Sequence, residues 1–237
     1  MANLIVDIGN TALKAAWADG ITLGRTFRYQ GERMAEFILS LTVKERPEVM
    51  VISSARKLSR QNISRLEQSC DKLLVLDDKV LEKYYLPLSL TPDRAASIIA
   101  SRFLFKGRGC TIFDFGTMLA VDFLDKNGNF TGGCISPGCM TRFKSVNRYS
   151  KNLPLLSLPD ETEDKGISLS ESIASGVISG IMFEIEGYIC KNPENINVFT
   201  GGDANYFAKR MKNSIFVVCN LVLMGLALIA LEYDKTN

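Results

Sequence analysis

Two apolar runs in this sequence end in the same unusual way, with an aspartate followed closely by a glycine and a threonine. The first run leads into DIGNT at 7–11, and the second into DFGT at 114–117. A plain hydrophobic core does not require an aspartate at a strand end. The second copy follows the first after nearly half of the 237 residues. A repeat on this scale predicts a duplicated α/β architecture with a cleft between its halves.

The segments around both copies alternate between strand-like and helix-like patterns. In the first half we expect strands at 3–9, 12–20, 47–54 and 71–76, and helices at 31–44, 63–70 and 94–105. In the second half we expect strands at 110–116 and 118–125, a long helix at 170–189, and a strand, glycine turn and helix over 195–212. We place the boundary of the two predicted domains between 107 and 108, giving domains 1–107 and 108–237.

The composition is that of an ordinary globular protein. The chain is 46% hydrophobic and 23% charged, with a net charge of +2 and no long basic run, so it carries no nucleic-acid signature. Met1 is followed almost directly by a strand-like run without a basic segment, which predicts no signal peptide and a cytoplasmic location. The six cysteines form no C-x-x-C pair and are expected to be free thiols in a reducing compartment.

One stretch, 215–231, is apolar enough to raise the question of a membrane span. Asn220 and Gly225 interrupt it, and its first residues, IFVV, are typical of a strand. We therefore predict a short strand followed by a core helix that starts near Asn220, and no membrane association.

The chain contains no histidine. A Ser–His–Asp site, a Cys–His site and a His-liganded zinc are therefore impossible. Any general base must be a carboxylate, or else Lys, Tyr or Cys.

Several motifs suit phosphate chemistry. The turn DIGNT offers backbone N–H groups, with Lys14 nearby as a positive charge and Asp7 as a ligand for a hydrated Mg²⁺. FTGGDAN at 199–205 and GGCISPG at 132–138 are further glycine-rich loops. Each also fits a simpler structure: DIGNT an ordinary β-hairpin, and Asp203 a helix N-cap. The chain has neither a P-loop nor a G-x-G-x-x-G motif.

Five motifs in order, DIGNT, PLSLTPDR, DFGT, GGCISPG and TGGDA, resemble those of the type III pantothenate kinases, from Asp7 to the NLVLMGL segment at 220–226. The resemblance implies the actin-like ATPase fold, with two ribonuclease-H-like halves around a nucleotide cleft. It implies ATP-dependent phosphorylation of pantothenate to 4'-phosphopantothenate, the first step of coenzyme A biosynthesis. It also implies Mg²⁺, a monovalent cation (K⁺ or NH₄⁺), and a homodimer with the pantothenate pocket near the dimer interface.

The resemblance assigns roles by position in these motifs. Asp93 matches the catalytic base, with Arg94 as its partner at the substrate, and Asp114 matches the ligand of the monovalent cation. ATP contacts are assigned to Asp7, Ile8, Gly9, Asn10, Thr11, Ala12, Leu13, Lys14 and Thr117. Pantothenate contacts are assigned to Tyr84, Thr91, Pro92, Asp93, Arg94 and Leu169. Tyr85 replaces Tyr84 if the loop is shifted by one residue, and Asp93-Arg94 taken alone also fits a plain helix start.

Three residues depart from the family pattern: Thr91 replaces a glycine, and Ala120 and Leu169 each replace a threonine. They cluster on the substrate side more than on the ATP side. Two alternatives to a pantothenate kinase therefore remain open. One is a non-catalytic, nucleotide-binding regulatory relative, and the other is a kinase or phosphohydrolase of the same superfamily with another substrate.

Overall fold

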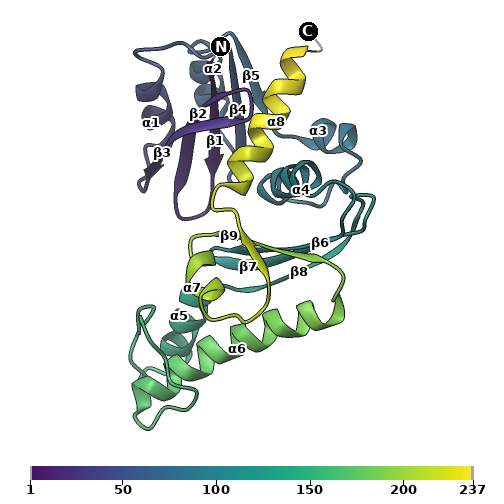
Figure 1. Cartoon of the computed structure of the whole chain (residues 1–237). Helices are drawn as coiled ribbons and strands as arrows, with labels where there is room; N and C mark the ends of the chain where they lie inside the picture. Colours follow the sequence, from purple (N-terminus) through teal and green to yellow (C-terminus); the bar gives the residue numbers. More distant parts are fainter. Residues whose placement is uncertain (1, 236–237) are drawn as a thin grey trace. The chain divides into compact units, whose positions relative to one another are not determined.

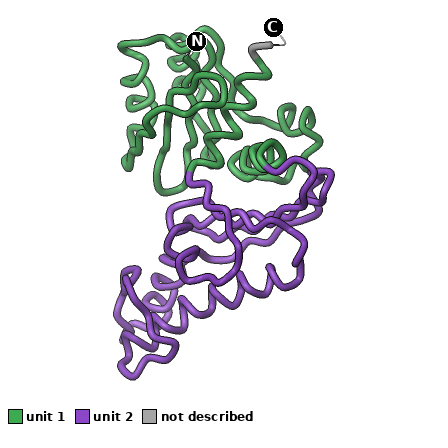
Figure 2. The backbone as a smooth tube through the Cα atoms, viewed as in Figure 1, with its two compact units in different colours: residues 1–104, 220–237 green, residues 105–219 purple. Residues whose placement is uncertain are grey.

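The computed structural model describes the backbone of residues 2–235 and the side chains of residues 2–233 (Figure 1). The chain divides into two compact units, one formed by residues 1–104 and 220–237 and the other by residues 105–219 (Figure 2). The first break lies three residues from the predicted boundary. The predicted domains differ from these units at the C-terminus, because residues 220–237 belong to the first unit.

The first unit is built on a five-stranded sheet with the order β3-β2-β1-β4-β5. Its strands are β1 (Ala2–Ile8), β2 (Leu13–Asp19), β3 (Thr22–Tyr29), β4 (Val49–Ser54) and β5 (Lys72–Val75). Its helices are α1 (Met34–Leu41), α2 (Arg60–Glu67), α3 (Asp78–Lys83), α4 (Pro92–Leu104) and α8 (Leu221–Lys235). The first three strands are antiparallel, and β4 and β5 continue the sheet in parallel with β1.

The second unit repeats this arrangement. Its sheet has the order β8-β7-β6-β9-β10, with β6, β7 and β8 antiparallel and β9 and β10 parallel to β6. The strands are β6 (Cys110–Phe115), β7 (Met118–Leu124), β8 (Phe130–Pro137), β9 (Ile196–Gly201) and β10 (Ile215–Val217). The helices are α5 (Cys139–Tyr149), α6 (Leu169–Lys191) and α7 (Ala204–Ala208). The matching strand orders confirm the predicted duplication.

Helix α8 joins the first unit because its apolar residues complete that unit's core. It contacts β1 and β4 and packs extensively on α4, and its buried residues include Leu221, Leu223 and Leu226. The stretch 215–231 is thus the predicted short strand, β10, followed by a core helix. Among the described residues one helix, α6, is long and apolar enough to span a membrane. Its Ile178, Ile181 and Ile185 lie in the core of the second unit.

Four elements were not predicted from the sequence: β3, α3, β8 and α5. Strand β3 lies at the edge of its sheet and is largely exposed, so it lacks a regular apolar alternation. In β8 the residues do alternate between exposed and half-buried, but Gly132 and Gly133 interrupt the sequence pattern. Edge strands are stabilised by pairing with a neighbour, which a local pattern does not record.

Candidate active site

The DIGNT segment forms the turn of the β1–β2 hairpin. The Gly9 N–H donates to the Ala12 carbonyl at 3.0 Å, and a Cβ added at Gly9 would lie 3.2 Å from the same oxygen. Asn10 and Thr11 are exposed at the tip. The segment is therefore a β-hairpin, as its simpler interpretation predicted, and its tip presents the polar groups that a phosphate would contact.

Asp7 lies on the face of the first sheet that carries α4 and α8. Leu4, Val6 and Ile8 form a core cluster with residues of α1 and α2, so the alternate residues of β1 face the other way. On that second face, Asp7 is paired in register with Lys14 of β2 and Ser53 of β4. The hairpin therefore places a carboxylate next to a lysine at the end of the first strand.

Asp93 lies in the first turn of α4, which begins at Pro92. One of its carboxylate oxygens accepts the Arg94 N–H at 2.9 Å, and the Thr91 carbonyl accepts the Ala95 N–H at 3.0 Å. Pro92 at the first helical position and an acid in the first turn are favourable helix-start chemistry. Local capping alone thus explains the helix start, while Asp93 and Arg94 stay half-exposed and accessible to a ligand.

Thr91 does not strain the backbone where the family has a glycine. Tyr85 is the only non-glycine residue in the described part of the chain with a positive φ. A glycine is required only where φ is positive or the backbone approaches another group closely. Thr91 therefore adopts a conformation open to any residue, and this departure leaves the loop before Asp93 intact.

Tyr84 and Tyr85 are in opposite environments. The Tyr84 hydroxyl donates to Glu232 Oε2 at 2.6 Å, and burial, together with the Glu232 carboxylate, raises the pKa of Tyr84 above its ordinary value. Tyr85 is 92% exposed and has a φ of 54°. The sequence left open whether Tyr84 or Tyr85 contacts pantothenate. Of these two residues, only Tyr85 presents nearly its whole side chain to solvent.

Three glycine-rich loops meet in the second unit. The Gly138 N–H and the Thr141 hydroxyl both donate to the Thr117 carbonyl, at 3.0 and 2.6 Å. The Gly202 N–H donates to the Phe115 carbonyl at 2.8 Å. DFGT, ISPG and TGG therefore lie together at one end of the second sheet, although they are widely separated in the sequence.

Glycine is required where these loops touch. A Cβ at Gly138 would lie 2.1 Å from the Gly116 carbonyl oxygen. At Gly201, whose φ is 93°, it would lie 2.6 Å from Asp114 Oδ1. These close approaches explain why glycine occupies both positions.

Asp114 occupies the position in the second unit that Asp7 occupies in the first. Phe113 and Phe115 lie in the core with α5, α6 and α7, so Asp114 points to the opposite face of its sheet. Its register partners are Thr200 of β9, which is buried, and Ala120 of β7. The departure from threonine at Ala120 thus removes a hydroxyl directly beside Asp114.

Asp203 is a candidate site residue that was not assigned from the sequence. It follows Gly202 in the TGGDA motif, and burial raises the pKa of its carboxyl group. Burial raises the pKa of Cys139, at the start of α5, and the negative charge of Asp203 adds to this rise. The sequence signal was present in the motif, but Asp203 also fitted a plain helix N-cap. The structure finds no side-chain capping bond there.

Leu169 is the first residue of α6 and is 53% exposed. The preceding Ser168 accepts the Glu171 N–H at 3.2 Å, and Glu171 Oε2 accepts the N–H groups of Ser168 and Ile167 at 2.9 and 3.0 Å. These backbone donors hold the pKa of Glu171 below its ordinary value. The Ser168 hydroxyl is thus part of a capping box and does not replace the missing threonine.

The predicted site residues are divided between the two units. The first unit holds the hairpin residues 7–14, Tyr84 and Thr91–Arg94, and the second holds Asp114, Thr117 and Leu169. The hairpin residues lie together, as do Thr91–Arg94. Asp114 and Thr117 lie at the junction of the three glycine loops.

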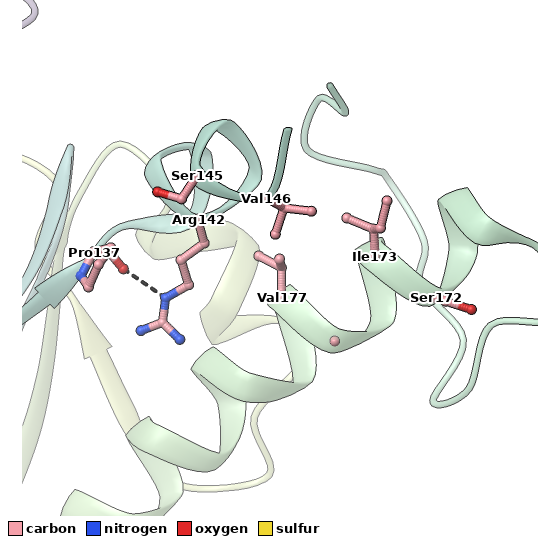
Figure 3. A pocket seen from close by; sticks show the side chains of 8 residues that line it. Pro137, Arg142, Ser145, Val146, Ser172, Ile173 and Val177 are labelled. Carbon is pink, nitrogen blue, oxygen red and sulfur yellow. Dashed lines mark hydrogen bonds between the residues drawn. The ribbon is translucent and has the colours of Figure 1, made fainter. Parts of the chain in front are cut away.

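A separate cavity of about 490 Å³ lies between α5 and α6 (Figure 3). Val146, Ile173 and Val177 line it, and Arg142 borders it with its Nε donating to the Pro137 carbonyl at 2.8 Å (Figure 3). Arg142 also pairs with Glu184. The residues assigned to ATP, to pantothenate and to the cations do not line this cavity, but Pro137 of the GGCISPG loop does, so the cavity adjoins that loop.

The architecture is that of the actin-like ATPases and their kinase relatives. The activator of 2-hydroxyisocaproyl-CoA dehydratase from Clostridium difficile, solved with bound ADPNP, matches with a TM-score of 0.62 at 18% identity, covering 100% of this chain and 96% of the other. The ROK hexokinase from Thermus thermophilus matches with a TM-score of 0.53 at 14% identity, with both chains fully covered. The predicted fold class is confirmed.

The family is shown at the level of sequence. The type III pantothenate kinase family matches residues 3–191. The type III pantothenate kinase of Phocaeicola vulgatus is 36% identical, covering 98% of this chain and 99% of the relative. The type III pantothenate kinase of Cytophaga hutchinsonii is also 36% identical, covering 94% of this chain and 96% of the relative. The chain belongs to the type III pantothenate kinase family, which confirms the resemblance predicted from its motifs.

Proposed function

We propose that this protein transfers the terminal phosphoryl group of ATP to the hydroxyl group of pantothenate, giving 4'-phosphopantothenate, the first step of coenzyme A biosynthesis. The observation that carries the proposal is the full-length similarity to relatives named type III pantothenate kinases. The retained Asp7, Asp93 and Asp114 support an active enzyme.

In the proposed mechanism Asp93 accepts the proton of the attacking hydroxyl group. The Asp93 carboxylate is half-exposed at the start of α4, and its neighbour Arg94 neutralises the substrate carboxylate or the developing charge. The hairpin N–H groups and Lys14 bind the phosphates of ATP. Phosphoryl transfer asks mainly for positioning and charge neutralisation, which fits a chain without histidine.

The donor groups fit the two proposed ions. Asp7 offers a carboxylate for Mg²⁺ through water, and Mg²⁺ typically keeps several waters and takes few protein ligands. Asp114, with the buried Thr200 as its register partner, offers the oxygen ligands that a K⁺ or NH₄⁺ ion prefers. When bound, these cations neutralise charge on the phosphates.

The function is tested by following pantothenate-dependent ATP consumption with purified protein. We expect turnover with Mg²⁺ and K⁺ together, and loss of turnover when either ion is omitted. Asp114→Asn should change the K⁺ dependence, whereas Asp7→Asn should change the Mg²⁺–ATP dependence. ATP binding without turnover would identify a non-catalytic relative, and turnover only with another alcohol would identify a kinase with a different substrate.

We further infer a cytoplasmic homodimer that assembles through α6. Four residues of α6 share one helix face because they are spaced by seven, four and three residues. They are Leu169, Gly176, Gly180 and Phe183, and we call them the α6 stripe. Phe183 is 69% exposed. Gly176 lines the cavity between α5 and α6, where an added Cβ would meet nothing within 4 Å, and a Cβ at Gly180 would lie 3.7 Å from Arg142 Nη1. An uncharged stripe with an exposed phenylalanine fits a partner helix.

Replacing Phe183 with Glu should separate the dimer. In a twofold interface the change appears twice, so two carboxylates are buried close together. We expect light scattering to give twice the 26.2 kDa chain mass for the wild type and the single mass for the variant. Tyr149→Glu, at an 85% exposed aromatic residue of α5, is the control and should stay dimeric. A wild-type monomer, or a dimeric Phe183→Glu variant, would contradict assembly through the stripe.

A further inference from the structure

The loop between α3 and α4 is tied to the C-terminal helix by a side-chain hydrogen bond. Tyr84, at the end of α3, donates its hydroxyl proton to Glu232 Oε2 of α8 at 2.6 Å. Arg102 of α4 donates from Nη1 to the Tyr84 carbonyl at 2.7 Å. Tyr84 is therefore held through its side chain and through its backbone by two different helices.

This attachment lies next to the most unusual backbone position of the loop. Tyr85 has a φ of 54°, in the left-handed region that non-glycine residues rarely adopt. Such a conformation persists only where the surroundings fix it. The C-terminal turn of α3 holds Tyr85 in this conformation, because the Tyr85 N–H donates to the Glu82 carbonyl at 3.0 Å, as in a Schellman motif. The two bonds to Tyr84 attach this turn to α4 and α8, and the Tyr85 side chain is left 92% exposed.

The rest of the loop is also anchored up to the start of α4. The Leu86 N–H donates to the Leu81 carbonyl and the Leu90 N–H to the Pro87 carbonyl, both at 3.0 Å. The side chains of Leu86 and Leu90 are buried. The segment 84–91, here called the substrate loop, thus runs as a defined path from Tyr84 to Asp93.

We propose that Glu232 is a positioning residue of this kinase, acting through Tyr84. By accepting the Tyr84 hydroxyl proton, Glu232 fixes the start of the substrate loop. It thereby orients Tyr85 toward the substrate and sets the path of the chain into Asp93. Tyr84 then serves as an anchor, because its hydroxyl group already donates its one hydrogen bond to Glu232. The proposal rests on the proposed function for the identity of the substrate, pantothenate.

Two replacements of Glu232 test this role. Glu232→Leu removes the acceptor, and we expect the KM for pantothenate to rise about tenfold while the KM for ATP changes little. Glu232→Gln keeps an acceptor oxygen in the same place and should stay within about twofold of the wild type. Glu82→Leu, at an exposed glutamate of α3, is the matched control and should leave both constants unchanged.

A double-mutant cycle shows whether Glu232 acts through Tyr84. Tyr84→Phe should raise the KM for pantothenate as Glu232→Leu does, and the double variant should be no worse than either single variant. Additive effects of the two changes would overturn the proposal. An equal rise in the KM for ATP would also overturn it, since that result indicates general loosening of the unit.

Hydrogen exchange tests the anchor without any assay of activity. The Leu86 amide should exchange faster in Glu232→Leu than in the wild type, but not in Glu82→Leu. A wild-type protein that does not phosphorylate pantothenate would overturn the proposed function, and the exchange result would still decide whether Glu232 holds the loop. Unchanged exchange at Leu86 in Glu232→Leu would overturn the proposed anchor.

Discussion

Asp93→Asn should lower kcat about a hundredfold or more while the protein folds normally, because a general base typically contributes a factor of this size. The asparagine keeps an oxygen that can accept the Arg94 N–H, which Asp93 accepts at 2.9 Å. It lacks the basicity needed to take a proton from the substrate. A hundredfold loss corresponds to about 2.7 kcal/mol of transition-state stabilisation.

The control for this prediction is Asp78→Asn. Asp78 is also an acid in a first helical turn, that of α3, so its replacement removes the same favourable interaction with the helix dipole, worth up to about 1 kcal/mol. We expect similar small changes in unfolding free energy for both variants and a kinetic loss for Asp93→Asn alone. A kcat within a few fold of the wild type would remove Asp93 from the role of base.

Gly225→Ala should destabilise the protein by about 2–3 kcal/mol, the upper range for an overpacked core. A Cβ at Gly225 would lie 1.9 Å from the Ala96 carbonyl oxygen and 2.5 Å from its carbon. Because these are backbone atoms, α8 and α4 must separate to admit a methyl group. Urea unfolding measures the loss, and kcat should fall as well, since α4 carries Asp93 at its first turn.

Gly24→Ala is the matched control for Gly225→Ala. Gly24 is an exposed residue of β3 in the same unit, where an added Cβ would make an ordinary contact of 3.4 Å. The same methyl group should there stabilise the protein by about 0.5–1 kcal/mol, because alanine loses less backbone entropy than glycine on folding. A Gly225→Ala variant as stable as the wild type would show that the α4–α8 contact is not tightly packed.

Much of the architecture could be predicted because its signals are local. The strands before Asp7 and Asp114 are apolar runs, and each is closed by a turn whose residues are within four positions of the aspartate. The helix start at Pro92 follows from proline and an acid in one turn. Elements of this kind depend on neighbours in sequence, so the pattern of residues is enough to find them.

The candidate site was harder to predict, because its residues gain their roles from partners far away in the sequence. Asp203 matched a helix N-cap as well as a site residue, and two features of the fold separate the interpretations: its side chain makes no capping bond, and burial raises its pKa. Tyr84 and Tyr85 are adjacent and chemically identical. They differ because Glu232, 148 residues from Tyr84, accepts the hydroxyl proton of one and not of the other. No local pattern contains that information.

The sequence by itself determined the duplicated plan of two α/β halves, the absence of histidine chemistry, and the family, since these depend on residue identity and on short-range order. Only the tertiary structure decided that α8 returns to the first unit, where Gly225 allows its backbone to contact Ala96. It also decided that three glycine loops meet beside Asp114. The physical reason is the same in each case. Close backbone contacts between distant segments depend on how the elements pack, and one residue's chemistry does not specify its distant partner.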